Sequence, residues 1–255
     1  MPTGARRLLL RLWSCHARRA LRLSRLWLAA LALAVTGPAM VAASDTITGA
    51  HYSEPTTRYG HGVLGDDVEW GALVLATSQG QITIRLPQSR VFEDTAPRLI
   101  TGDRGAPLAM VIETDTSRGA RLSLYNAAGL YAATPYIGRT HRWLAPLGAA
   151  DLDGDGWPEI AYVDRPHLAK TLRIWRLKDG KLTEIAAQPG LTNHRIGEDN
   201  ISGGIRNCGS GPEIISASAN WSRLIASTLK NGQITTRDIG PHTGPNSFEN
   251  ALDCR

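Results

Sequence analysis

Acidic residues are absent from the first 43 positions of this sequence of 255 residues, and no apolar run in that segment is long enough to cross a bilayer. The segment instead combines seven arginines, an apolar run at residues 26–35, a Gly37-Pro38 break and small residues ending at Ala43. This order predicts a signal peptide, residues 1–43, with cleavage after Ala43. The apolar run is shorter than the roughly 20 residues that span a bilayer. We therefore expect no membrane span after cleavage, and an uncleaved anchor is the alternative.

A basic excess is also lacking once the signal peptide is removed. Seven of the 28 Lys and Arg residues lie in the signal, which leaves 21 basic and 23 acidic residues and a formal charge of −2. Binding to nucleic acid requires a basic patch on the folded domain, so the charge gives no support to a nucleic-acid partner. The signal predicts a periplasmic or secreted protein. The pair Arg18-Arg19 leaves the export route open.

Cysteine is scarce: of three in the chain, Cys15 lies in the signal, and Cys208 and Cys254 remain. Such a pair in an oxidising compartment predicts a disulfide between Cys208 and Cys254, and two unrelated thiols are the alternative. Ser/Gly tracts, Pro tracts and charge blocks are absent too, so no linker divides residues 44–255. We expect one domain with a sizeable core there.

Four segments share one pattern, in which a β-rich run, a turn centred on glycine and a second β-rich run follow each other. The turn glycines are spaced 49, 51 and 52 residues apart: Gly80, Gly129, Gly180 and Gly232. Asp179-Gly180 and Asn231-Gly232 are strong hairpin signals, because these dipeptides tolerate the positive φ of tight turns. Helical signals are almost absent after the signal peptide.

A second shared element precedes each of the last three hairpins, at residues 105–115, 156–164 and 211–219. Each reads as a turn, a proline and a β run. A unit thus holds about three or four strands in about 50 residues, which is the size of a propeller blade. The predicted fold is all-β, a β-propeller-like array of about four such repeats forming a small or partial propeller. An antiparallel sandwich is the alternative, because it also has short strands at regular spacing.

The sharpest chemical motif is the loop DLDGDGWPE at residues 151–159. Its carboxylates occupy loop positions 1, 3, 5 and 9, and its seventh position offers a backbone carbonyl, so hard oxygen ligands converge as calcium requires. These ligands are Asp151, Asp153, Asp155, Trp157 (through its carbonyl) and Glu159. An EF-hand is excluded, because the twelfth position is Tyr162 and a strand follows where a helix is needed. An acidic, solvated turn is the alternative.

The stretch AADLDGDGWPEIAYVD, followed by TLRIWRL, resembles an FG-GAP or VCBS repeat. Such repeats occur in integrin-type β-propellers and in many bacterial surface proteins. The resemblance covers residues 146–185 closely and most of the mature chain weakly, and it implies that the Asp-rich loop binds calcium through the residues just named. The equivalent stretches at residues 100–105 and 205–210 have lost the carboxylates. We therefore expect one calcium site.

Weaker candidates lie near the unit boundaries, where the loops of a propeller converge on one face. They are His141, His167, His194 and Glu198. Convergence would create a metal or acid/base site. No nucleophile elbow, zinc spacing or phosphate-cradling loop accompanies them, so polar loop residues that satisfy backbone groups are the plainer interpretation.

The function expected from these features is that of a non-enzymatic binding or scaffolding module for an unknown protein or glycan ligand. This expectation rests largely on fold analogy. A secreted or periplasmic hydrolase or lyase with an active site on the ring face is the main alternative, and an assembly factor for an envelope complex is a minor one. An enzyme should gather the histidines in one pocket with perturbed pKa values.

Overall fold

β-strands make up nearly all the regular structure of residues 45–255, which are the residues that this computed structural model describes. The predicted signal peptide and its cleavage site after Ala43 lie outside these residues. The all-β class is confirmed, with one short helix, α1, Pro245–Leu252. Between residues 45 and 255, no helix has both the length and the apolar character needed to cross a membrane.

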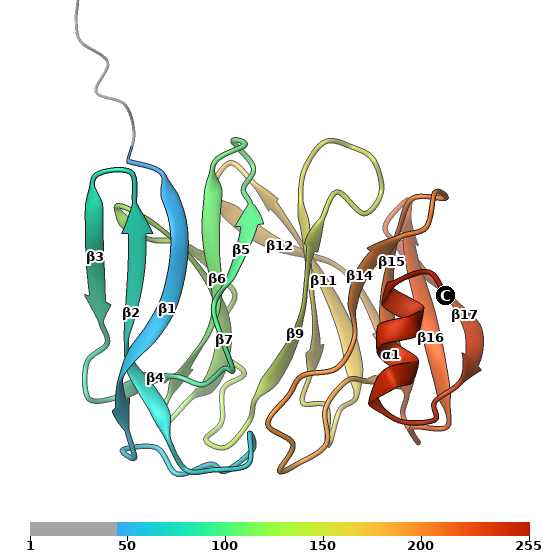
Figure 1. Cartoon of the computed structure of the whole chain (residues 1–255), viewed down its shortest axis with the longest axis horizontal. Coiled ribbons are helices and arrows are strands. Elements are labelled where there is room, and N and C mark those ends of the chain that lie inside the picture. Colours follow the sequence, from blue (N-terminus) through green and yellow to red (C-terminus); the bar gives the residue numbers. More distant parts are fainter. Residues whose placement is uncertain (1–44) are drawn as a thin grey trace, which may run out of the picture. The chain divides into compact units, whose positions relative to one another are not determined.

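The first sheet has eight antiparallel strands in the order β1-β2-β4-β6-β7-β8, with β3 beside β2 and β5 beside β6 (Figure 1). Its strands are β1 (Ile47–Thr56), β2 (Glu69–Thr77), β3 (Gly80–Arg85), β4 (Arg90–Phe92), β5 (Arg98–Thr101), β6 (Pro107–Asp115), β7 (Gly119–Asn126) and β8 (Gly129–Ala133). This sheet joins the first two predicted units. The connection is β4, which pairs with β2 through Trp70 and Phe92 and with β6 along its whole length.

The second and third sheets each correspond to one predicted unit. The second has the order β12-β11-β10-β9, and the third has the order β13-β15-β16-β17 with β14 beside β15. Their strands are β9 (Leu144–Ala150), β10 (Glu159–Asp164), β11 (Thr171–Lys178), β12 (Lys181–Pro189), β13 (Leu191–Thr192), β14 (Gly204–Asn207), β15 (Pro212–Ser218), β16 (Arg223–Lys230) and β17 (Gln233–Pro241).

All four predicted hairpins are present, as β2–β3, β7–β8, β11–β12 and β16–β17. Asp179 and Gly180 have φ of 50° and 72°, and Asn231 and Gly232 have φ of 52° and 72°. Two successive positive φ values are those of the tight turn that these dipeptides favour. Both turns therefore have the backbone geometry that their dipeptides predict.

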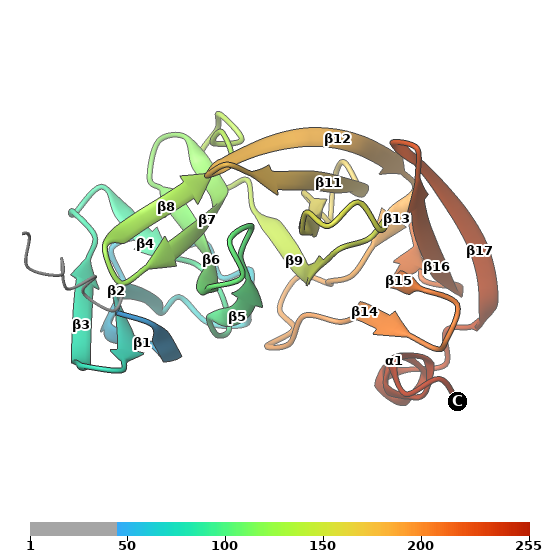
Figure 2. The same ribbon diagram turned by 90° about the horizontal axis from the view of Figure 1, so that it is seen from above.

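Neighbouring sheets pack through strands that are buried on both faces. In β10, Ile160 and Tyr162 join a core cluster with the first sheet, whereas Ala161 and Val163 join a cluster with the third. Alternate residues of a strand point to opposite faces, so β10 serves two cores at once. The strands β5, β9 and β14 lie next to each other along one side, and β8, β12 and β17 along the other (Figure 2).

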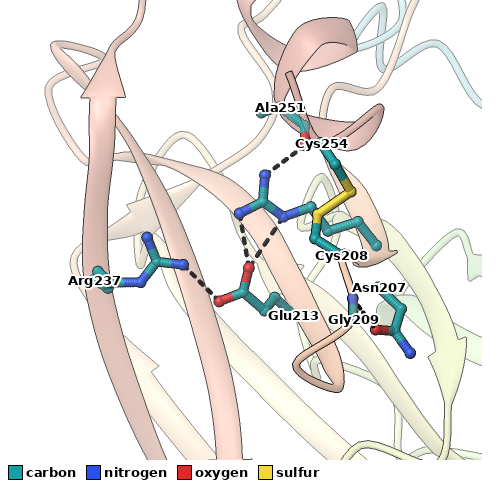
Figure 3. Close-up of a disulfide and its surroundings, with 8 residues drawn as sticks. Asn207, Cys208, Gly209, Glu213, Arg237, Ala251 and Cys254 are labelled. Atoms are coloured by element: carbon teal, nitrogen blue, oxygen red, sulfur yellow. Dashed lines mark hydrogen bonds and ion pairs between the residues drawn. A yellow bond between two sulfur atoms is a disulfide. The ribbon is translucent and has the colours of Figure 1, made fainter.

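The C-terminal segment covers the third sheet. Phe248 and Ala251 of α1 pack on Ile215 and Ala217 of β15. Cys208 and Cys254, the predicted pair, form a disulfide with 5.7 Å between their Cα atoms (Figure 3). It ties the end of the helix to the turn that follows β14. Beside it, Glu213 accepts hydrogen bonds from two arginines, Arg206 of β14 and Arg237 of β17.

Candidate functional site

The acidic loop of residues 151–159 joins β9 to β10 and is folded around its own carboxylates. Asp151 accepts hydrogen bonds from the backbone N–H groups of Gly154 (2.8 Å) and Gly156 (3.0 Å). These two glycines have φ of 79° and 87°, so the loop curls in the left-handed region that glycine tolerates. Glu159 is fully buried at the start of β10, and its Oε2 accepts from the backbone N–H of Leu152 over 2.8 Å. Local backbone geometry thus turns the side chains of the loop inward.

Asp151, Asp153 and Glu159 form a group that could hold a metal ion, because one oxygen of each lies within 4.8 Å of the others. Among residues 45–255 it is the one group of three or more His, Cys, Asp or Glu side chains that meets this condition. Asp155 is outside the group, and its Oδ1 accepts from the backbone N–H of Trp157 over 2.9 Å. Three of the four predicted carboxylates are therefore brought together.

Arg176 of β11 completes this cluster, and the sequence analysis did not identify it. Its Nε is 2.6 Å from Oε1 of Glu159, and its terminal nitrogens are 2.5 Å from Oδ2 of Asp153 and 3.1 Å from Oδ2 of Asp155. Arg176 faces Glu159 directly in the β10–β11 register, so strand pairing sets the contact. One guanidinium therefore offsets part of the charge of three carboxylates.

The donor set fits a hard cation. Every side-chain donor of the loop is an oxygen, which is the ligand type that calcium prefers. Oδ1 of Asp153 is buried and has no hydrogen-bond partner among residues 45–255. Burial raises the pKa of the Glu159 carboxyl, and the hydrogen bond from Arg176 opposes that rise. An unpartnered buried oxygen is costly unless a cation or water contacts it, so Asp153 is the residue that most directly indicates an ion.

A second polar cluster lies where loops of all three sheets meet around Trp143. His167 Nε2 is 3.0 Å from His194 Nδ1, and both rings contact the Trp143 ring, with centroids 6.5 Å and 5.0 Å away. His61 stacks on His141 with ring centroids 5.0 Å apart. His61 and His167 line the same small cavity, of about 30 Å³. The three predicted histidines therefore gather in one region, together with His61.

Buried acids orient this cluster. Nδ1 of His61 is paired with the fully buried carboxylate of Glu93, which also accepts a hydrogen bond from the hydroxyl of Thr114. The indole N–H of Trp143 donates to the backbone carbonyl of Glu93 over 2.8 Å. Glu198, a predicted site residue, contributes its backbone carbonyl, which lies 2.9 Å from Nε2 of His194. Its carboxylate lies beside Arg195 instead.

The environment shifts several pKa values in this region. Burial, followed by the charges of His194 and His61, lowers the pKa of His167 to about 4. Burial also lowers the pKa of His194. Burial and the negative charges of Glu93 and Asp66 raise the pKa of Glu69, at the start of β2, to about 9. Both histidines and this carboxyl are therefore neutral near neutral pH.

His61, Glu69 and Glu93 carry no sequence signal that would have placed them in the cluster. His61 lies in the loop between β1 and β2, and Glu93 directly follows the three-residue strand β4. The contact between His61 and Glu93 depends on β4 joining two units, which the repeat pattern does not predict.

Comparison with known proteins identifies no relative of this chain. No protein-family model and no curated protein matches it.

Proposed function

We propose that this chain is an exported, calcium-binding β-propeller-like repeat protein that acts as a non-enzymatic binding or scaffolding module. The observation that carries the proposal is the convergence of Asp151, Asp153 and Glu159 on one point. Calcium is the ion proposed, because the loop offers carboxylate oxygens and the carbonyl of Trp157 and no nitrogen or sulfur ligand.

The ion's role is structural in this proposal. The loop leads directly into β10, whose residues pack into two cores, so fixing the loop fixes the start of a central strand. Arg176 already supplies one positive charge to the same carboxylates. The ion and the guanidinium therefore compete for the same carboxylates. We expect a dissociation constant for calcium of about 10⁻⁴ to 10⁻³ M, as in extracellular calcium modules.

The propeller-like arrangement is supported by the order of the strands. The second sheet is an antiparallel meander of four strands in chain order, and β5–β8 and β14–β17 pair in the same consecutive way. The first strands of these meanders, β5, β9 and β14, lie side by side. Propeller blades have this topology, and their connecting loops gather on the faces. A protein or glycan partner would be bound there.

Calorimetric titration with calcium tests the proposal most simply. One equivalent of calcium should bind to the wild-type protein, and Asp153→Ala should weaken binding at least about tenfold, because the buried oxygen of Asp153 is lost. Asp199→Ala is the matched control, since Asp199 is exposed and lies outside the loop. Equal affinity for calcium in all three proteins would contradict the proposal.

A hydrolase or lyase is the second candidate, favoured by the cluster around Trp143. The charge of Glu93 helps to raise the pKa of Glu69, and the charge of His61, the partner of Glu93, helps to lower the pKa of His167. Acid/base chemistry uses carboxyls and imidazoles with such opposite shifts. A panel of esters, phosphoesters and polysaccharides distinguishes the candidates. Turnover that is lost in His167→Gln and kept in Asp153→Ala would favour the enzyme.

A further inference from the structure

Three imidazoles from three separate loops meet beside Trp143. His61 lies between β1 and β2, His167 lies between β10 and β11, and His194 follows β13. The cavity of about 30 Å³ lined by His61 and His167 has room for one water molecule or one ion. The site is small and built from loops of several sheets, so its geometry depends on the whole fold.

Hydrogen bonds define which nitrogen of His194 is available. Its Nε2 is 2.9 Å from the backbone carbonyl of Glu198, and a carbonyl can only accept, so Nε2 carries the proton. In the neutral ring, Nδ1 of His194 then carries a lone pair. This nitrogen lies 3.0 Å from Nε2 of His167. Two imidazole nitrogens on one tetrahedral zinc ion, with bonds of 2.0–2.1 Å, lie about 3.3 Å apart. The His167–His194 pair is already close to that separation.

His61 is oriented in the manner of a metal ligand. Its Nδ1 is paired with the buried carboxylate of Glu93, and its Nε2 makes no hydrogen bond within residues 45–255. Metal-binding histidines generally donate their second N–H to a carboxylate or a backbone carbonyl, which fixes the ring and leaves the other nitrogen for the ion. Both arrangements occur here, at Glu93 for His61 and at the carbonyl of Glu198 for His194.

We propose that His61, His167 and His194 bind a transition-metal ion of the Zn²⁺, Co²⁺ or Cu²⁺ class. Imidazole nitrogen suits these ions, whereas calcium prefers oxygen, so this site is distinct in chemistry and position from the acidic loop. The ion takes the place of the His167 Nε2 proton, which moves to Nδ1 of the same ring. The three side chains do not lie within 4.8 Å of one another, so His61 completes the site by a tilt of its ring that keeps the contact between Nδ1 and Glu93.

Two positive charges bear on this site, Arg165 at the cavity and Lys170, whose charge acts on His167. Arg165 lines the same cavity, but its Nε and a terminal nitrogen lie 2.8 Å and 2.9 Å from the two carboxylate oxygens of Asp164. The buried carboxylate of Glu93 stands on the other side, behind His61. Asp164 thus offsets the charge of Arg165, and Glu93 adds a negative charge that favours a divalent cation, while Lys170 donates to the backbone carbonyl of Ala219.

Titration of the untagged protein with Co²⁺, followed by its visible absorption, tests the proposal. One equivalent should give the bands of a nitrogen-ligated ion, and Zn²⁺ should displace it. His167→Gln and Glu93→Gln should each weaken binding at least about tenfold, the latter through the orientation of His61. His51→Gln and His242→Gln are matched controls, since these residues lie outside the cluster, and Asp153→Ala separates the site from the acidic loop.

Electron paramagnetic resonance of the wild-type protein with one equivalent of Cu²⁺ provides a readout that needs no variant. Couplings to two or more imidazole nitrogens are expected. Oxygen-only coordination of Cu²⁺, absence of the Co²⁺ bands, or an equal loss of binding in the His51 and His242 controls would overturn the proposal, whatever the outcome for calcium.

Discussion

Arg176 faces Glu159 across the β10–β11 ladder, and its Nε donates a hydrogen bond to Oε1 of Glu159 over 2.6 Å. The same guanidinium contacts Asp153 and Asp155, so the acidic loop is partly neutralised by the protein itself. The contacts of Arg176 therefore reduce the effect of removing calcium from the loop. The carboxylates do not simply repel one another without calcium, because Arg176 remains among them.

Replacing Arg176 by Gln should destabilise the protein without calcium by about 3 kcal/mol, because Glu159 would be left as a buried charge without its partner. The low end of the usual range applies, since the Arg176 side chain is 24% exposed. Urea unfolding in the presence of a chelator measures this loss. Arg173→Gln is the matched control and should cost less, because its partner Asp164 keeps a second ion pair with Arg165.

Calcium should bind more tightly to Arg176→Gln than to the wild-type protein, because the competing guanidinium is gone. We expect a gain of about tenfold in affinity, the equivalent of about 1.4 kcal/mol. Calorimetric titration with calcium of the wild-type protein, Arg176→Gln and the control Arg173→Gln measures this gain. Unchanged or weaker affinity in Arg176→Gln would show that Arg176 does not compete with the ion.

The disulfide should hold α1 on the third sheet. Loss of the Cys208–Cys254 bond, which spans 46 residues of sequence, should cost about 2 to 5 kcal/mol. Hydrogen exchange of the Cys208→Ser/Cys254→Ser double variant should show the first loss of protection in α1 and β14. A uniform change over all three sheets would contradict the local role assigned to this bond.

Glu69 should make stability fall as pH rises. Its folded-state pKa is about 9 and its unfolded-state pKa is about 4.3, so the folded form holds a proton that the unfolded form releases between these values. The contribution is complete below about pH 4 and is lost progressively up to about pH 9. Glu69→Gln keeps a neutral side chain at all pH values. Denaturant midpoints from pH 5 to 8.5 should therefore fall less in this variant, and parallel profiles would contradict the burial argument.

Local sequence determined the elements that were predicted correctly. Asp179-Gly180 and Asn231-Gly232 define their hairpins through backbone preferences that need no tertiary context. The loop at residues 151–159 was recognisable for the same reason, because its ligands lie close together in the chain.

Residues that depend on strand pairing across units could not be predicted from the repeat. The three-residue strand β4 merges two units into one sheet and brings Glu93 to His61. It is too short to show the alternation of apolar and polar residues by which a strand is recognised in a sequence. Arg176 was accessible in principle, since aligning β10 with β11 places it opposite Glu159. The sequence placed His141, His167 and His194 near unit boundaries, but it could not predict their contacts, because these depend on how three sheets pack.

A thermal melting curve with calcium and with chelator tests the central claim that the acidic loop binds a structural calcium ion. The wild-type midpoint should rise with calcium by the equivalent of about 1 to 3 kcal/mol when the ion exceeds its dissociation constant by tenfold or more. Asp153→Ala should lose that rise, and Asp199→Ala should keep it. A wild-type midpoint that ignores calcium after exhaustive metal removal, or an undiminished rise in Asp153→Ala, would contradict the account.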